Sequence, residues 1–82
     1  MKALEGAEDL IGSIPVLPKA KEVIIEMVFQ LGKTGVSRFA KMWEALGNQD
    51  YDEAANQMLD SRWHKQTKSR AESLATIMRS LA

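Results

Sequence analysis

Residues 18–32 read PKAKEVIIEMVFQLG and have a helical pattern of apolar residues. The apolar residues of this stretch recur every three or four positions, which is the spacing of an α-helix and not of a strand. Pro18 suits a first helical turn and Gly32 suits a left-handed stop, so the sequence predicts a helix over 18–31. Apolar side chains cover more than half of its circumference, so we expect this helix to be the central element of the core. The apolar stripe contains Ile24, Met27, Val28 and Leu31, with Ile25 and Phe29 beside it.

The segments on both sides of this helix also have helical spacing, and none has the alternation of a strand. We expect further helices over 2–11, 36–46, 51–60 and about 68–81. Together these elements predict an all-α fold, a small single domain of four or five helices. The predicted core contains Met27, Val28, Leu31, Phe39, Trp43, Ala55, Met58, Leu74 and Met78.

The starts of the last two predicted helices carry capping signals. Asp50 and Glu53 have the spacing of a capping box, in which an N-cap side chain and the residue three positions later satisfy each other's backbone N–H groups. Thr67 and Ser69 are both candidate caps for the last helix, and the pair Ser69 and Glu72 has the better spacing. Of the connections, 33–35 is predicted to be a tight turn and 12–17, interrupted by Pro15, a linker.

The composition limits the chemistry that this chain can carry. Eighty-two residues suffice for one core and not for two. The chain has no cysteine and a single histidine, so no thiolate chemistry, metal site or cofactor is expected. The net charge is zero, which argues against a general polyanion binder. Residues 1–60 hold six bases and ten acids, whereas 61–82 hold five bases and one acid, so the C-terminal end is cationic.

Catalytic patterns in the sequence are weak. Glu8 and Asp9, and the acids within 50–53, could supply a general acid and a general base, but helix dipoles and solvated faces explain acids at these positions. Ser61 and His64 lie three residues apart on one helical face, yet no acid is placed in the sequence to orient the imidazole. We therefore expect no catalytic residue in this chain.

Residues 61–70, which read SRWHKQTKSR, interleave an aromatic ring, an amide and four cations. An indole face stacks on a sugar or a base, an amide pairs with hydroxyl groups, and a guanidinium binds a carboxylate or a phosphate. The segment therefore predicts a binding surface for something polar and flat. The alternative is that Trp63 is a buried core residue surrounded by solvated cations, and the spacing does not separate these two interpretations.

Two blocks of the sequence resemble the lysozymes of T-even bacteriophages. The first is MVFQxGxTGV over 27–36, and the second is SRWxxQTxxRA over 61–71. The resemblance is to the C-terminal helical lobe of that family and runs from Ile24 to Ala71, which is 48 of 82 residues. It implies that residues 18–82 are a lysozyme-like helical lobe. Residues 1–17 do not match and are expected to be an N-terminal arm or a short helix plus linker.

The resemblance implies a substrate and a set of binding residues. Those enzymes hydrolyse the glycan strands of peptidoglycan in a cleft between a small N-terminal lobe, which holds the catalytic glutamate, and this helical lobe. Phe29 and Gln30 would line the floor of the cleft, and Arg70 would pair with the catalytic glutamate. The implied substrate-binding residues are Phe29, Gln30, Gln57, Trp63, Gln66 and Arg70.

Three positions depart from the pattern of the family. Met42 stands where the family has a substrate-contacting serine, so glycan contact there is lost. Gln57 replaces an asparagine and keeps the amide one methylene further out, and Lys68 replaces a proline before the last helix. The catalytic signature of the N-terminal lobe has no counterpart in this chain.

The resemblance therefore implies a lobe that contributes the glycan-binding side of a peptidoglycan-hydrolysing cleft. It would be inactive without a catalytic N-terminal lobe on another chain or in a missing segment, because glycoside hydrolysis needs two carboxyl groups across the scissile bond. The alternative is a noncatalytic phage structural or interaction protein that binds a protein or a nucleic acid. A nucleic acid is the weaker partner, because most of the chain is acidic.

The expected partners are a peptidoglycan glycan strand, a catalytic lobe on a separate chain, and a second copy bound through the exposed cleft face. Without the other lobe, Phe29 and Trp63 should be exposed together as an apolar patch that a partner covers. Residues 1–17 could fold back over it or exchange with a second copy. With no signal peptide or membrane span visible, we expect the protein in the host cytoplasm or in the phage particle.

Overall fold

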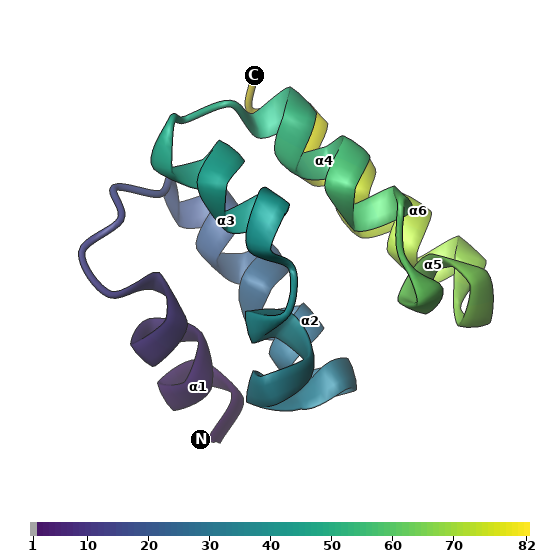
Figure 1. Cartoon of the computed structure of the whole chain (residues 1–82), viewed down its shortest axis with the longest axis horizontal. Coiled ribbons are helices and arrows are strands. Elements are labelled where there is room, and N and C mark those ends of the chain that lie inside the picture. The colour runs from purple at the N-terminus through teal and green to yellow at the C-terminus, as the bar shows by residue number, and fades with distance from the viewer. Residues whose placement is uncertain (1) are drawn as a thin grey trace.

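The computed structural model describes the backbone of residues 2–82 and the side chains from Leu4 onward. The described residues form six helices and no strand, so the predicted all-α fold is confirmed, with one helix more than the four or five expected (Figure 1). The helices are α1 (Lys2–Ile11), α2 (Pro18–Ser37), α3 (Ala40–Gly47), α4 (Tyr51–Leu59), α5 (Arg62–Gln66) and α6 (Lys68–Arg79).

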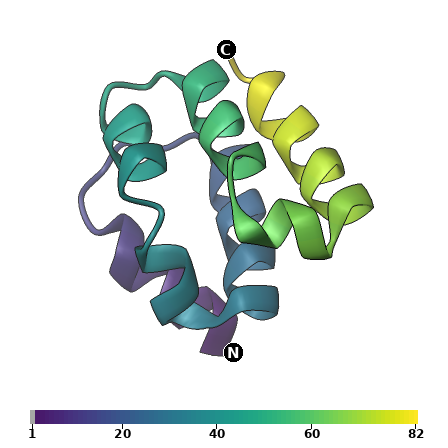
Figure 2. The same ribbon diagram turned by 45° about the vertical axis from the view of Figure 1, so that its right-hand side comes forward.

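The helices pack in two groups that α2 joins. On one side α1 lies against α2, and on the other α4 lies alongside α6 while also contacting α3. Figures 1 and 2 both show α4 and α6 side by side, with the short α5 linking them at one end. Because α2 also contacts α6, it connects the two groups as the predicted central helix. None of the described helices is long and apolar enough to cross a membrane.

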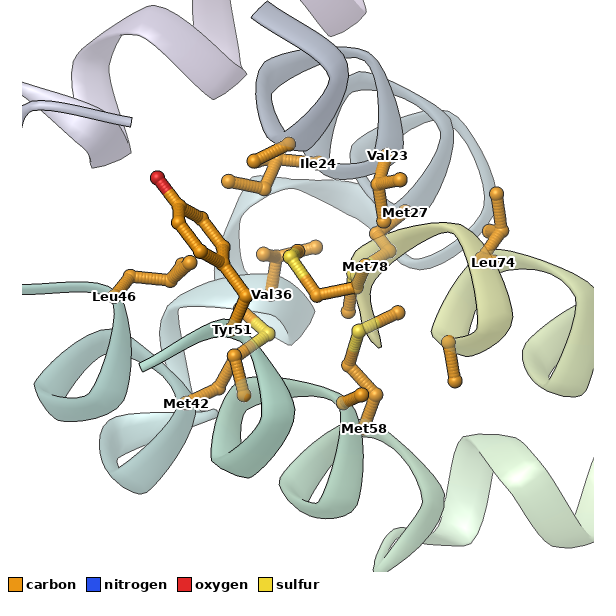
Figure 3. Close-up of a cluster of buried hydrophobic side chains, with 14 of the residues drawn as sticks. Val23, Ile24, Met27, Val36, Met42, Leu46, Tyr51, Met58, Leu74 and Met78 are labelled. Atoms are coloured by element: carbon orange, nitrogen blue, oxygen red, sulfur yellow. The ribbon is translucent and has the colours of Figure 1, made fainter. Parts of the chain in front are cut away.

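Four methionines from four different helices meet at the centre of the core (Figure 3). Met27 of α2, Met42 of α3, Met58 of α4 and Met78 of α6 are all fully buried. Methionine is unbranched and flexible, so it fills the irregular space where several short helices cross. The core around them includes Val23, Ile24, Val36, Leu46, Tyr51 and Leu74.

Three of the predicted core residues lie at its edge instead. Leu31, Phe39 and Trp43 are only partly buried and pack against the core from outside. Trp43 is held there because its indole Nε1 donates a hydrogen bond to the backbone oxygen of Val36 at 3.0 Å. Met42, which precedes it, points inward and is fully buried.

The helix predicted over 18–31 does break at Gly32, but helical structure resumes after it. Gly32 has φ 78° and ψ 161°, a conformation that favours glycine, and 33–37 then forms another helical turn within α2. The prediction that 33–35 is a tight connection is therefore wrong. The extra turn places Val36 in the core with no exposed surface. The chain instead turns at 38–39, so α3 begins later than the predicted helix over 36–46.

The two predicted capping boxes have different outcomes. The Asp50 side chain accepts a hydrogen bond from the backbone N–H of Glu53 at 3.2 Å, which confirms the predicted cap of α4. The prediction of a Ser69 cap for the last helix is wrong, because α6 begins at Lys68 and Thr67 is its N-cap residue. The Thr67 hydroxyl does not cap α6. It donates a hydrogen bond to the backbone oxygen of Trp63 at 3.0 Å, at the end of α5.

Helix α1 folds back onto α2 of the same chain. Its Ala7 and Ile11 belong to the buried core. At Gly6 an added Cβ would lie 3.1 Å from a methyl group of Val28, so the absence of a side chain there permits the close approach of the two helices. Two ion pairs tie the helices at the surface, Lys21 with Glu8 at 3.4 Å and Lys33 with Asp9 at 3.0 Å.

Candidate functional site

The contact between α2 and α5 is centred on Trp63 and Gln30. Trp63 is 4% exposed, and its indole Nε1 donates a hydrogen bond to Gln30 Oε1 at 3.1 Å. Its ring also meets the ring of Phe39 edge to face, with centroids 6.3 Å apart and an interplanar angle of 80°. The structure therefore supports the alternative in which Trp63 is a buried core residue. The prediction that its indole face is open for stacking is wrong.

The other amide atom of Gln30 is left without a partner. Gln30 Nε2 is buried and makes no hydrogen bond to any described residue. A buried N–H group without an acceptor costs about 1–3 kcal/mol. The amide is nevertheless held in this orientation because its oxygen is the acceptor for the Trp63 indole.

Phe29 lies next to Gln30 in the chain but is 71% exposed, which is far more than the other large apolar side chains at the surface. It borders a shallow hollow of about 420 Å³ together with Glu5, Asp9 and Lys33. The expected exposure of Phe29 is thus observed. Phe29 and Trp63 do not form one exposed patch, because Trp63 is covered by its own chain.

Gln57 lies at a second hollow, where the start of α3 meets the end of α4. This hollow has a volume of about 270 Å³ and is also lined by Arg38, Lys41 and Asp60. The Gln57 amide donates to Glu53 Oε2 at 2.7 Å, so it is already partly engaged. Hydrogen bonds from Gln57 and from a neighbouring asparagine, with the charge of Lys41, lower the pKa of Glu53 from its ordinary value of 4.5.

The remaining two predicted binding residues are exposed near the α5–α6 junction. Gln66 is the last residue of α5, and Arg70 is in the first turn of α6. Arg70 borders a hollow between α2 and α6 together with Glu26 and Ser73. The six predicted binding residues therefore do not converge on one pocket. Gln30 and Trp63 are in contact, Phe29 precedes Gln30 in the chain and borders the hollow beside α1, and Gln57, Gln66 and Arg70 lie at separate places.

The carboxylates that the sequence offered as a possible acid and base make other contacts. Of the carboxylates singled out, Glu8 and Asp9 pair with lysines of α2, and Asp52 pairs with Arg79 at 2.9 Å. The described part of the chain has no group of three or more acids and histidines that could hold a metal ion. These carboxylates form exposed ion pairs between helices.

An acid does reach His64, although the sequence did not indicate one. Glu72 Oε2 lies 2.9 Å from His64 Nε2, because α6 runs back past α5. The Ser61 hydroxyl is directed elsewhere: it donates to the backbone oxygen of Met58 at 2.7 Å and accepts from the backbone N–H of His64 at 3.3 Å. Ser61 is therefore the cap of α5, and the three residues do not form a nucleophile–base–acid chain. The three-residue spacing of Ser61 and His64 is that of an N-cap and its backbone donor, so it could have indicated the start of α5.

The fold and these contacts define a small helical domain in which a buried tryptophan on one helix is hydrogen-bonded to a glutamine on the central helix, beside an exposed phenylalanine. The chain shares sequence with known proteins, including the following two. The chain is 34% identical over 61 residues to the pre-baseplate central spike protein Gp5 of Enterobacteria phage T4, which covers 73% of this chain and 11% of that protein. It is 32% identical over 57 residues to a protein of Dictyostelium discoideum named probable T4-type lysozyme 2, which covers 70% of this chain and 34% of that protein.

The chain thus contains a region similar to phage lysozymes and spans about a third or less of the length of these two relatives. No model of a known protein family matches it. No solved structure matches it either.

Proposed function

We propose that residues 18–82 are a helical lobe that forms the glycan-binding side of a peptidoglycan-hydrolysing cleft, with residues 1–17 as an arm that completes its core. The lobe is inactive by itself and acts with a catalytic N-terminal lobe on another chain or in a missing segment. The similarity to a T4-type lysozyme supports this reading.

The observation that carries the proposal is the arrangement around Gln30. Its amide is tied to Trp63, and the neighbouring Phe29 is 71% exposed on the same helix. An exposed aromatic ring offers a flat apolar face for contact with a partner or a sugar. We assign Phe29 and Gln30 to the floor of the cleft, Gln57 and Gln66 to polar contact with the glycan, Trp63 to holding Gln30, and Arg70 to the catalytic carboxylate of the other lobe.

The test adds the whole chain to a suspension of peptidoglycan, alone and together with a separately produced N-terminal lobe of a T4-type lysozyme. We expect no fall in turbidity with either protein alone and a fall with both together. Phe29→Ala should slow this combined reaction by about tenfold or more, since a central aromatic contact commonly contributes about 2 kcal/mol to an interface. Ile77→Ala is the matched control, because Ile77 is another exposed apolar residue, 40% exposed on α6.

Turbidity that falls with this chain alone would mean that acids such as Asp50 or Glu53 perform chemistry, and the proposal would be wrong. The second candidate is a noncatalytic structural protein of a phage particle, and the similarity to a phage central spike protein favours it. Failure to bind peptidoglycan, together with no activity in the combined reaction, would support this second candidate.

A further inference from the structure

Helix α5 has only five residues, so contacts with the rest of the chain hold it in place more than its own backbone bonds do. In the described part of the chain, its side chains make two hydrogen bonds to other helices. Trp63 Nε1 donates to Gln30 Oε1 of α2 at 3.1 Å. His64 Nε2 lies 2.9 Å from Glu72 Oε2 of α6. A carboxylate only accepts hydrogen bonds, so the imidazole Nε2 is the donor in this second contact.

The two contacts leave α5 in different directions. Successive residues of an α-helix are about 100° apart around its axis, so Trp63 and His64 hold α5 from two sides. The other hydrogen bonds of this segment involve the Ser61 cap and the Thr67 hydroxyl, and they join residues close in the chain. They stabilise the turn of α5 but do not set its rotation relative to α2 and α6. The contact of His64 with Glu72 therefore limits how far Trp63 can turn away from α2.

The orientation of the Gln30 amide depends on Trp63. Gln30 Oε1 accepts the indole N–H, whereas Gln30 Nε2 makes no hydrogen bond to any described residue. A flipped amide would place its N–H groups against the indole N–H, which brings donors together without an acceptor. One hydrogen bond thus selects the orientation of this amide, and a displacement of Trp63 would release it.

We propose that His64 and Glu72 are positioning residues, whose contact keeps Trp63 against Gln30 and so presents the Gln30 amide to the glycan. The inference rests on the proposed function, which assigns Gln30 to the floor of the cleft. It adds two residues that act through Trp63. Glu72 is the one acid within 61–82, so no other carboxylate of this segment can replace it.

The two tryptophans of the chain allow one spectrum to test this inference. Trp43 Nε1 donates to the backbone oxygen of Val36, so its indole N–H is an internal reference for that of Trp63. Hydrogen exchange of both indole N–H groups, followed by NMR on the full chain, measures local opening at each. Glu72→Ala should speed exchange at Trp63 by about twofold to fivefold, the effect of losing a partly exposed ion pair, and leave exchange at Trp43 unchanged.

Two further variants control for the chemistry of the change. Glu72→Gln keeps a side-chain oxygen that can accept from His64, so it should restore most of the protection at Trp63. Asp52→Ala is the matched control, because Asp52 forms an equally short pair with Arg79 at the far end of α6 from α5. It should leave exchange at Trp63 unchanged.

Unchanged exchange at Trp63 in Glu72→Ala would overturn the inference and leave the proposed function standing. Equal acceleration at Trp43 and Trp63 would also overturn it, because the pair would then add only to the stability of the whole domain. In the combined turbidity reaction, Glu72→Ala should slow clearing by a factor similar to its effect on exchange, and clearing at the original rate would overturn the positioning role. A combined reaction that fails with the unchanged chain would overturn the proposed function and, with it, this role.

Discussion

Trp63 and the four buried methionines show how single side chains hold this small protein together. The Trp63 indole joins α5 to α2 through one hydrogen bond to Gln30 and one edge-to-face contact with Phe39. The methionines come from four different helices and fill the space between them. Removing a side chain from this centre leaves a cavity that the surrounding helices fill only in part. The loss in free energy of unfolding is therefore expected to be large.

Met27→Ala should lower the free energy of unfolding by about 2–5 kcal/mol, because Met27 has no exposed surface. Phe29→Ala, two residues further along the same helix, is the matched control. Phe29 is 71% exposed, so its removal should change the free energy of unfolding by less than about 1 kcal/mol. Urea denaturation of the two variants measures both values, and equal losses would contradict the assignment of core and surface on α2.

Helix α4 depends on its first turn for much of its local stability. Asp50 caps it, and Asp52 and Glu53 add acids where the helix dipole favours them. Hydrogen bonds from Gln57 and Asn56 lower the pKa of the Glu53 carboxyl, so they favour its charged form in the folded chain. The stabilisation is therefore present above the ordinary pKa of glutamate and is lost as the pH falls through the lowered value. Because the group is fully exposed, this effect is small compared with the cap.

Asp50→Ala should destabilise the protein by about 1 kcal/mol, since it leaves the backbone N–H of Glu53 without its acceptor. Asp50→Asn keeps a side-chain oxygen at the same place and should retain most of the stability. Thermal unfolding followed by circular dichroism measures the difference between the two variants. An alanine variant as stable as the asparagine variant would show that this hydrogen bond does not stabilise α4.

At the scale of the whole molecule, α1 completes the core from one side. Ala7 and Ile11 are buried against α2, and the Leu17 backbone N–H donates to the Tyr51 hydroxyl at 3.1 Å. The arm thus folds back within its own chain. Phe29 remains outside this cover and is 71% exposed.

A chain that begins at Pro18 should self-associate, because it would expose the face of α2 that α1 buries. The full chain, with α1 in place, should associate less at the same concentration. Sedimentation over a range of concentrations measures both. In the full chain, Phe29→Ala should reduce any remaining association. Identical sedimentation of the two chains at high concentration would contradict a role for α1 in covering this face.

Helical periodicity in the sequence predicted the fold class and the longer helices, and the glycine at position 32 predicted the break there. Buried positions such as Met27, Met58, Leu74 and Met78 follow from the same periodicity, and the confirmed cap at Asp50 follows from local spacing. These features depend on residues a few positions apart, which a sequence displays directly. The two blocks shared with phage lysozymes are likewise local, and they indicated the relatives.

Which faces of those helices are buried depends on contacts between segments that are distant in the chain. Trp63 packs in the interior and donates its indole hydrogen bond to Gln30, which is 33 residues away. His64 pairs with Glu72 because α6 runs back past α5. Leu31, Phe39 and Trp43 have the spacing of core residues yet remain at its edge, since Met42 and Val36 fill the interior. Burial depends on which helix covers a given face, and that is set by packing between segments distant in the chain.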